Sequence, residues 1–356
     1  MQLLDRLTAV VMAALDRLMN RLGDILDPVI RWCGPLMVAL AAALIVTIPS
    51  GYTWVIAPNT VLKFSQTTHD NDDFFWSAWL GWLAHWLLLL WAMPNLVFNF
   101  AMSVGVSPGR VSAVAMSSSA SSASSYIAQT DLNSSATAAE LYPPRSCQPC
   151  IVSKPPRAFH CTICRSCILK MDHHCPWINQ CVGHHNHVYF VLFLAYVTIA
   201  CSYICAASSG PFMVCFDSPN PPEYPDNARG IVLYTFSASF AVAVAVGALF
   251  VWQLYLVSTA QTTIEYHRNN DLRAELKRMG KRFVNPLSRG PVQNFRDFFL
   301  IDVKQPWSAL LYPHTIRMPT DGYTWAQLQK AGSFAVDANG AYCDNVRVGI
   351  PAGVEC

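Results

Sequence analysis

Four long stretches without a charged side chain constrain the fold of this 356-residue chain more than any other feature. Each is long enough to cross the roughly 30 Å hydrocarbon layer of a bilayer, which takes about 20 helical residues. The composition agrees, because 53% of the residues are hydrophobic and only 13% are charged, whereas about a quarter are charged in a typical soluble domain. The sequence therefore predicts four transmembrane helices, at residues 34–56, 75–102, 188–207 and 230–258.

Lysine and arginine alternate in number between the segments that these helices separate. Counted from the N-terminus, the five segments contain 4, 1, 6, 1 and 12 of these residues. Because cytosolic segments are enriched in Lys and Arg, both termini and the long central segment are expected in the cytosol, with residues 57–74 and 208–229 as luminal loops. A channel or transporter is disfavoured, because no span carries a charged residue.

The segments outside and inside the spans carry further patterns. Residues 1–33 have leucines at roughly helical spacing among charges, which predicts an amphipathic helix on the cytosolic membrane surface. Residues 103–144 contain the run SSSASSASS and are predicted to be a flexible linker. His85, Asn95 and Asn99 lie inside the second span. They are expected to form hydrogen bonds between helices, with a polar path as the alternative.

Seven of the 13 cysteines lie between residues 147 and 181. In a reduced cytosolic segment, C-x2-C spacing favours metal binding over disulfides. Two tetrahedral zinc sites need eight ligands, and six of these cysteines with two histidines supply them. Adjacent residues of an extended chain point to opposite sides, so His160 and Cys161 are expected on different ions. This predicts two interleaved sites, formed by Cys147, Cys150, His160 and Cys167 and by Cys161, Cys164, His174 and Cys181.

Cys175 is the cysteine that the eight-ligand count leaves over. If His174 faces the second zinc, the adjacent His173 faces away from it, towards Cys175. A thiol beside an imidazole is the arrangement of an activated nucleophile, and Asp172 would fix the tautomer of that imidazole. The alternative is a purely structural double-zinc module, such as a RING or a zinc knuckle. That alternative does not account for a seventh cysteine preceded by Asp and His.

The motif CQPC…KPPRAFHCTICRSCILKMDHHCPWINQCVGHHNHVYF, from Cys147 to Phe190, resembles the cysteine-rich domain of DHHC-type protein S-acyltransferases. TTIE at residues 262–265 is similar to the T-T-x-E motif of that family, and NPLSRGPVQNFRDFF at 285–299 is similar to its C-terminal motif of asparagine and aromatics. Residues 310–325 further resemble the Abl-philin branch. One position departs from the pattern, since Gln180 stands where the family usually has a second asparagine.

The resemblance implies a protein S-palmitoyltransferase, a polytopic α-helical membrane protein with a double-zinc domain at residues 145–187, between the second and third helices. Cys175 would take the acyl group of palmitoyl-CoA or a similar acyl-CoA and pass it to a cysteine of a membrane-associated protein. A non-catalytic zinc-knuckle membrane adaptor is the competing hypothesis. A membrane of the endoplasmic reticulum or Golgi is implied, no nucleic-acid partner is expected, and residues 326–356 match no known pattern.

The resemblance also assigns roles in the C-terminal region, residues 259–325, and around the acyl-CoA. Within the motif that begins at Thr262, Thr263 would bond to Asp172 and Glu265 would tie the tail to the catalytic region, while Asn294 would orient helix ends. The acyl chain would run from Cys175 down between the helices. The candidates to bind acyl-CoA are Lys154, Arg157, Trp177, Phe190, Phe193, Tyr196 and Ala200. Helix packing is the alternative for the aromatic residues, and solvated charge for the two basic ones.

Overall fold

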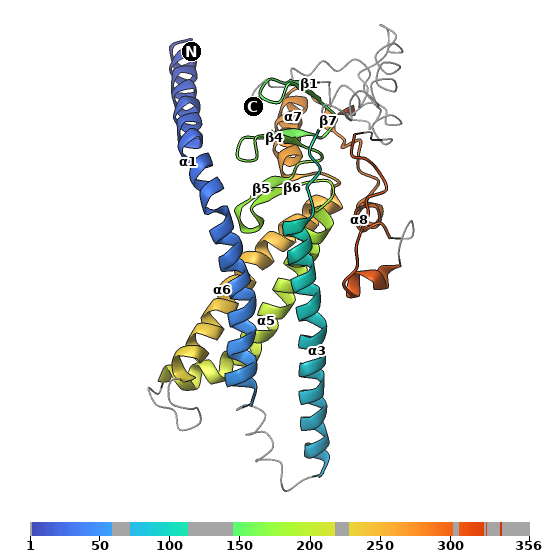
Figure 1. Ribbon diagram of the computed structural model, residues 1–356. Coiled ribbons are helices and arrows are strands. Elements are labelled where there is room, and N and C mark those ends of the chain that lie inside the picture. The colour runs from blue at the N-terminus through green and yellow to red at the C-terminus, as the bar shows by residue number, and fades with distance from the viewer. Residues whose placement is uncertain are drawn as a thin grey trace.

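A computed structural model shows a bundle of long helices with a small cysteine-rich domain at one end (Figure 1). It describes residues 2–58, 72–112, 145–217, 228–301, 306–323, 325 and 335–336. The linker residues 113–144, the loop residues 59–71 and 218–227, and most of the tail 326–356 lie outside the described residues.

Among the described residues, four helices are long and apolar enough to cross a membrane. They are α1 (Gln2–Gly51), α3 (Asp72–Gly105), α5 (His187–Asp217) and α6 (Ala228–Ser258), and the short π-helix η1 (Tyr52–Ile56) continues α1. Their apolar parts are Ile25–Ile56, Trp82–Gly105, His187–Asp217 and Ala228–Ser258. The predicted four-span fold is confirmed, and the helices extend beyond several of the expected boundaries.

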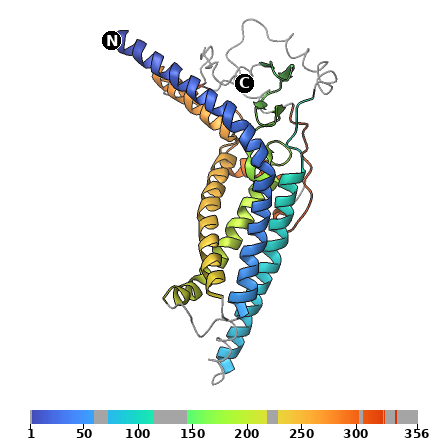
Figure 2. The ribbon, with the colours of Figure 1, turned by 60° about the vertical axis from the view of Figure 1, so that its left-hand side comes forward.

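The N-terminal segment differs from the expectation of a separate surface helix at residues 1–33, because α1 is continuous from Gln2 into the membrane-crossing stretch. Figure 2 shows its N-terminal part tilted relative to the part that belongs to the membrane bundle, which contacts α6. Pro28 and Pro35 lie inside the helix, and proline there removes a backbone hydrogen bond and kinks the axis. Gly34 lies so close to the cysteine-rich domain that an added Cβ would clash with the side chain of Asn179.

Side chains of α3 and α5, together with residues 299–301 and Ile316 of the C-terminal region, form a large apolar cluster. Its buried members include Leu96, Val191, Leu192, Val197 and Ile301. Inside the second span, Nδ1 of His85 lies within hydrogen-bond distance of the hydroxyls of Tyr52 and Tyr203, at 3.4 and 2.5 Å. His85 therefore connects α3 with η1 and α5, as expected for a polar residue between helices. Asn99 instead bonds within α3, to the oxygen of Asn95 at 2.8 Å.

The cysteine-rich domain consists of three antiparallel hairpins with three-residue strands. They are β1 (Arg145–Cys147) with β2 (Val152–Lys154), β3 (Phe159–Cys161) with β4 (Ser166–Ile168), and β5 (His173–Cys175) with β6 (Gln180–Val182), the last pair joined through the 3-10 helix η3 (Pro176–Ile178). The register places His160 opposite Cys167 and His174 opposite Cys181. Because opposed side chains lie about 5 Å apart, the second and third hairpins each bring a histidine beside a cysteine.

The C-terminal region begins with α7 (Thr263–Arg278) and continues through β7 (Arg282–Phe283), α8 (Pro291–Phe299) and the 3-10 helix η4 (Trp307–Leu311), with β8 (Ala335–Val336) paired to β7. The motif TTIE starts α7 because it forms a capping box. The Thr262 hydroxyl accepts from the backbone N–H of Glu265 at 3.3 Å, and the Glu265 carboxylate accepts from that of Thr262 at 2.9 Å. Both N–H groups lack partners inside the helix.

Candidate active site and zinc clusters

Two groups of three cysteines and one histidine lie in the domain, and within each group the ligand atoms are all within 4.8 Å of one another. Nδ1 of His160 lies 3.4, 3.2 and 3.9 Å from the sulfurs of Cys147, Cys150 and Cys167. Nδ1 of His174 lies 3.7, 3.3 and 3.6 Å from those of Cys161, Cys164 and Cys181. Ligands at tetrahedral angles, about 2.1–2.3 Å from zinc, are themselves about 3.6 Å apart. The two clusters therefore fit two zinc ions.

The clusters share the hairpin β3–β4, and this sharing determines what bound zinc would stabilise. The first group would tie β1–β2 to β3–β4, and the second would tie β3–β4 to β5–β6, since His160 and Cys161 are adjacent in β3 and belong to different groups. Strands this short bury few apolar side chains, and structural zinc contributes folding free energy in such domains. The structure brings together the ligand sets that spacing and adjacency predict.

His173 and Cys175 project from the face of β5 opposite to His174, because side chains alternate along a strand. Nδ1 of His173 lies 2.7 Å from Oδ2 of Asp172, and Cys175 lies two residues further along the same strand, on the same face. Burial lowers the pKa of His173, but the interactions with Asp172 and Cys175 outweigh it and raise the pKa to about 10. The imidazole is thus held between a carboxylate and a thiol.

The carboxylate of Asp172 is buried and is held by groups from the membrane bundle and α7. Thr263 donates its backbone N–H to Oδ1 at 2.7 Å and its hydroxyl to Oδ2 at 3.1 Å, and this is the contact expected for Thr263. Burial raises the pKa of Asp172. The hydrogen bond from His173, nearby positive charge and the Thr263 N–H outweigh burial and bring the pKa below its ordinary value. Asp172 is therefore ionised and able to stabilise an imidazolium.

Gln253 is a site residue that the sequence analysis missed. Its Nε2 donates to Oδ2 of Asp172 at 3.0 Å, and its Oε1 accepts from Nε2 of His187, also at 3.0 Å. Because His187 occupies the amide oxygen, the NH2 group faces the carboxylate. The sequence offers two signals for this contact: Gln253 is an amide within the fourth apolar span, and His187 stands just before the third. Neither forms a motif with Asp172, which is 81 residues away from Gln253.

Arg157 differs from its predicted role as a surface cation for the phosphates of CoA. It is buried, and its Nε and Nη2 donate to Oε1 and Oε2 of Glu265 at 2.6 and 2.7 Å. Because Glu265 also caps α7, the pair fastens the zinc domain to the C-terminal region, which is the tie expected of Glu265. Lys154, the second residue predicted to bind the phosphates of CoA, is buried as well. Little of its surface is therefore exposed to a ligand.

The predicted acyl-chain residues nearest the thiol lie together with it. Phe190 and Phe193 pack in the apolar cluster that contains Cys175, and the ring centroid of Phe190 is 5.3 Å from that of His173. Phe193 in turn packs against the ring of Phe100 of α3 at 5.2 Å. An acyl chain attached to Cys175 would meet these rings first.

The remaining predicted acyl-CoA residues are in different places. Tyr196 and Ala200 pack in the cluster with Leu96 rather than in that of Cys175. The Tyr196 hydroxyl donates to the oxygen of Leu310 at 2.6 Å, so this side chain faces the C-terminal region instead of the thiol. Trp177 lies in η3 and is half exposed.

Two amides fasten the ends of the membrane helices. Nε2 of Gln180 donates to three carbonyl oxygens at the end of α3, those of Ser103, Val104 and Val106, at 2.6, 2.9 and 3.0 Å. The last carbonyls of a helix lack partners within it. The side chain of Gln180, which is longer than the asparagine usual in the family, therefore ties the hairpin β5–β6 to α3. Asn294 bonds to the oxygen of Ser258 at the end of α6, at 2.7 Å, as expected for a residue that orients helix ends.

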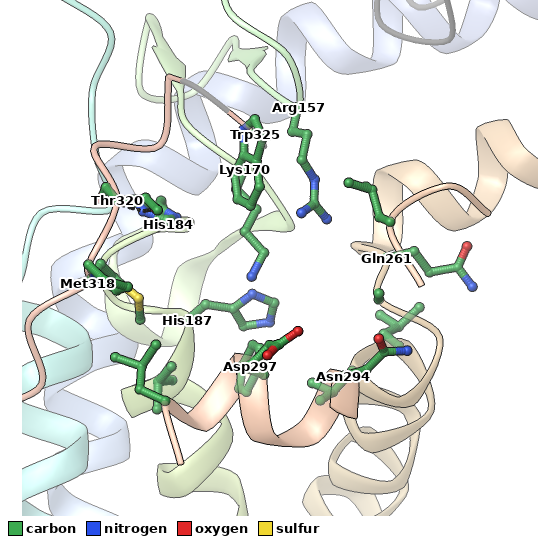
Figure 3. Close-up of a pocket in the computed structure, with 18 residues that line it drawn as sticks. Arg157, Lys170, His184, His187, Gln261, Asn294, Asp297, Met318, Thr320 and Trp325 are labelled. Atoms are coloured by element: carbon green, nitrogen blue, oxygen red, sulfur yellow. Dashed lines mark hydrogen bonds between the residues drawn. The ribbon is translucent and has the colours of Figure 1, made fainter. Parts of the chain in front are cut away.

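A cavity of about 240 Å³ lies between the zinc domain, α6 and α8. Figure 3 shows Lys170 and His187 pointing into it. The Lys170 ammonium lies 5.0 Å from the ring centroid of Phe298, and burial together with the charge of Arg157 lowers the pKa of Lys170 to about 7. Cys175 is not among the described residues that line this cavity, which is connected to Asp172 only through His187 and Gln253.

Most of the chain is similar to known proteins. Residues 140–270 match the family described as DHHC palmitoyltransferase. Palmitoyltransferase ZDHHC16 of Mus musculus is 30% identical over 347 residues, which cover 91% of this chain and 84% of the relative. Palmitoyltransferase ZDHHC16A of Danio rerio is 26% identical over 364 residues, with 87% and 82% covered. Palmitoyltransferase ZDHHC2 of Mus musculus is 37% identical over 163 residues, with 46% and 42% covered.

Proposed function

The chain belongs to the DHHC palmitoyltransferase family, in its Abl-philin-like branch, and we propose that it transfers acyl groups in two steps through Cys175. It is a multi-pass protein-cysteine S-palmitoyltransferase. The observation that carries the two-step proposal is the position of Cys175, which lies on the same face of β5 as His173 and packs with Phe190 at the end of the membrane bundle.

In the first step, His173 takes the proton of the Cys175 thiol, and the thiolate attacks the carbonyl carbon of the acyl-CoA thioester. The bond between that carbon and the sulfur of CoA breaks, and the CoA thiolate leaves with the proton from His173. The carboxylate of Asp172 stabilises the imidazolium in between, because it is ionised and bonded to Nδ1 at 2.7 Å. The products are free CoA and an acyl-enzyme thioester on Cys175.

In the second step, a cysteine of a membrane-associated protein replaces CoA. His173 takes the proton of the incoming thiol, the new thiolate attacks the acyl carbon, and the Cys175 thiolate leaves and regains a proton from the imidazolium. Palmitoyl-CoA is the proposed donor, since Phe190 and Phe193 form an apolar surface at the thiol. Burial of each CH2 of an acyl chain contributes about 0.8 kcal/mol, so a chain lying between helices is strongly favoured over one in water.

The proposed placement has both termini and the zinc domain in the cytosol, where acyl-CoA is available, and an endoplasmic reticulum or Golgi membrane around the bundle. The Lys and Arg counts of 4, 1, 6, 1 and 12 support this orientation. Zinc at the two clusters would hold the three hairpins and thereby the position of Cys175, without contacting the reacting atoms.

The test uses the full-length protein purified with zinc and incubated with labelled palmitoyl-CoA. We expect a thioester-linked label on the wild-type protein and none on the Cys175→Ala variant, while Cys205→Ala, a change on α5 outside both clusters, keeps the label. After removal of acyl-CoA, the labelled enzyme should still transfer its label to a substrate cysteine. A label that persists in Cys175→Ala, or transfer only while acyl-CoA is present, would contradict the two-step scheme.

A further inference from the structure

Residues 306–323, named the C-terminal strap, run along the outside of α3 and α5 after α8 (Figure 1). The strap starts with η4, and carbonyl oxygens of this short helix accept hydrogen bonds from side chains of the bundle. The bonds run from the Tyr196 hydroxyl to Leu310 at 2.6 Å, from Nε1 of Trp91 to Leu311 at 2.7 Å, and from Nδ2 of Asn95 to Leu311 at 3.3 Å. An irregular segment is thus bonded to two membrane-crossing helices.

These contacts lie far along both helices from the zinc domain. Tyr196 is nine residues beyond His187, where α5 starts, which corresponds to about 14 Å of helix. Asn95 is ten residues before Gly105, where α3 ends, or about 15 Å. Both residues belong to the apolar stretches that can cross a membrane.

The level of the membrane surface follows from α1. Its uncharged stretch begins after Arg31, and Gly34 lies against Asn179 of the zinc domain. The hydrocarbon layer, which is about 30 Å thick, therefore starts near the zinc domain and the adjoining ends of α3 and α5. Helix η4, about 15 Å further along, lies within this layer.

After η4, the strap returns towards the zinc domain along α5. The Tyr189 hydroxyl is hydrogen-bonded to both the N–H and the oxygen of Ile316. Further on, the oxygen of Thr320 lies 3.1 Å from Nε2 of His184, just before α5. The contacts of the strap thus move from Tyr196 back to the start of the helix, so the strap enters and leaves the layer on the same side.

Side chains of α3 and α5 satisfy the carbonyl oxygens of Leu310, Leu311 and Ile316 in the strap. An unpaired backbone carbonyl in the bilayer core costs several kcal/mol, so irregular backbone persists there only where protein groups satisfy it. The outer face of η4 and of the residue after it is also suited to lipid, since Trp307, Leu311 and Tyr312 are 48%, 54% and 52% exposed. The neighbouring α3 also exposes apolar side chains, those of Leu90 and Val97.

We propose that the C-terminal strap is a re-entrant membrane segment, and that Trp307, Leu311 and Tyr312 bind acyl chains of lipids in the leaflet on the side of the zinc domain. This goes beyond the proposed acyl transfer and does not depend on it. It also revises the expectation that residues 259–325 are wholly cytosolic. The strap then serves as a membrane anchor that stabilises the α3–α5 pair from its lipid side.

The test places a photoreactive benzoylphenylalanine at Leu311 in the full-length protein in phosphatidylcholine nanodiscs. Irradiation should give phosphatidylcholine adducts at this position, detected by mass spectrometry, in amounts similar to a probe at Val97. The matched control is Ile151, an apolar residue that is 90% exposed on the zinc domain, where no lipid adduct is expected. Lipid adducts at Leu311 no more frequent than at Ile151 would overturn the proposal.

A second measurement does not depend on the probe. In nanodiscs, the amides of η4 should exchange hydrogen more slowly than those of the exposed turn at Ile151. The Tyr196→Phe variant, which removes one of the donors without changing packing volume, should speed exchange in η4 by about fivefold and reduce the adducts at Leu311. Exchange in η4 as fast as at Ile151 in the wild-type protein would also overturn the proposal, whereas acyl-enzyme formation on Cys175 tests the proposed function separately.

Discussion

The zinc domain and the membrane bundle both contribute to the proposed catalytic site, yet they are held together by different interactions. The strands of the zinc domain are three residues long, and two Cys/His clusters stand where a hydrophobic core would be. The bundle packs apolar side chains from helices such as α5 and α6, each of 31 residues. The domain carries Asp172 and Cys175, while Thr263 and Gln253 from outside it hold the carboxylate. The chemistry therefore depends on the junction between the two.

Removal of a zinc ligand should separate the two regions most strongly. Cys161→Ser takes a ligand from the second cluster, and zinc supplies about 10–16 kcal/mol of folding free energy in small zinc domains. We expect zinc content to fall and acyl-enzyme formation to be abolished, while the helix content measured by circular dichroism stays unchanged. Cys205→Ser is the matched control and should retain its zinc. Loss of helix content in Cys161→Ser would show that the bundle also depends on the metal.

The next largest effect is expected where the regions are joined by charge. Glu265→Gln keeps the size of the side chain but leaves the buried guanidinium of Arg157 without its carboxylate, and breaking such a pair costs about 3–5 kcal/mol. We expect a lower unfolding temperature and faster proteolysis of the zinc domain. Asp271→Asn, at an exposed position of the same helix, should be neutral, and equal proteolysis of the two variants would contradict the joining role.

Loss of the amide that holds Asp172 should affect rate rather than folding. Gln253→Leu removes a hydrogen bond to a charged group, a bond that contributes about 1.5–3 kcal/mol. We expect acyl-enzyme formation on Cys175 to slow by about 10- to 150-fold, with zinc content unchanged. The control is Gln293→Leu on α8, whose amide bonds to Asp297 instead. An unchanged rate in Gln253→Leu would remove this residue from the site.

The smallest effect is expected at the position that departs from the family pattern. Gln180→Asn shortens the side chain by one CH2, so that its amide no longer reaches all three carbonyl oxygens of α3. We expect a loss of about 1 kcal/mol in unfolding free energy, seen as a small shift in thermal unfolding, and acyl-enzyme formation that stays close to wild type. A large loss of activity would mean that Gln180 acts on the thiol itself.

Local spacing was sufficient to predict the parts of the site that lie on the zinc domain. The ligand sets follow from C-x2-C pairs and from the opposite directions of His160 and Cys161, and both sets come together in the structure. The same alternation separates His173 from His174 on β5. The four spans follow from their lack of charge. These predictions succeed because each depends on residues close in sequence.

Predictions that depend on distant contacts were less successful. Arg157 was predicted to be a basic surface residue, because its carboxylate partner Glu265 is 108 positions away in the sequence. Tyr196 was grouped with Phe193 because the two lie on one face of a helix. Its hydroxyl instead donates to Leu310 of the strap, 114 positions away in the sequence. The continuity of α1 through Pro28 and Pro35 also escaped prediction. The composition changes from amphipathic to apolar there, while the helix itself continues.

The hydrogen bonds to Asp172 have a consequence for the time at which the enzyme becomes active during its synthesis. The nucleophile and its imidazole are complete once Cys175 has left the ribosome, but Gln253 lies in the last span and Thr263 follows it. Chains are made from the N-terminus, and their parts fold in that order. A nascent chain that has already bound its zinc therefore still lacks the groups that hold the carboxylate. If Asp172 acts as proposed, acyl transfer at full rate is expected only after the fourth helix has been inserted.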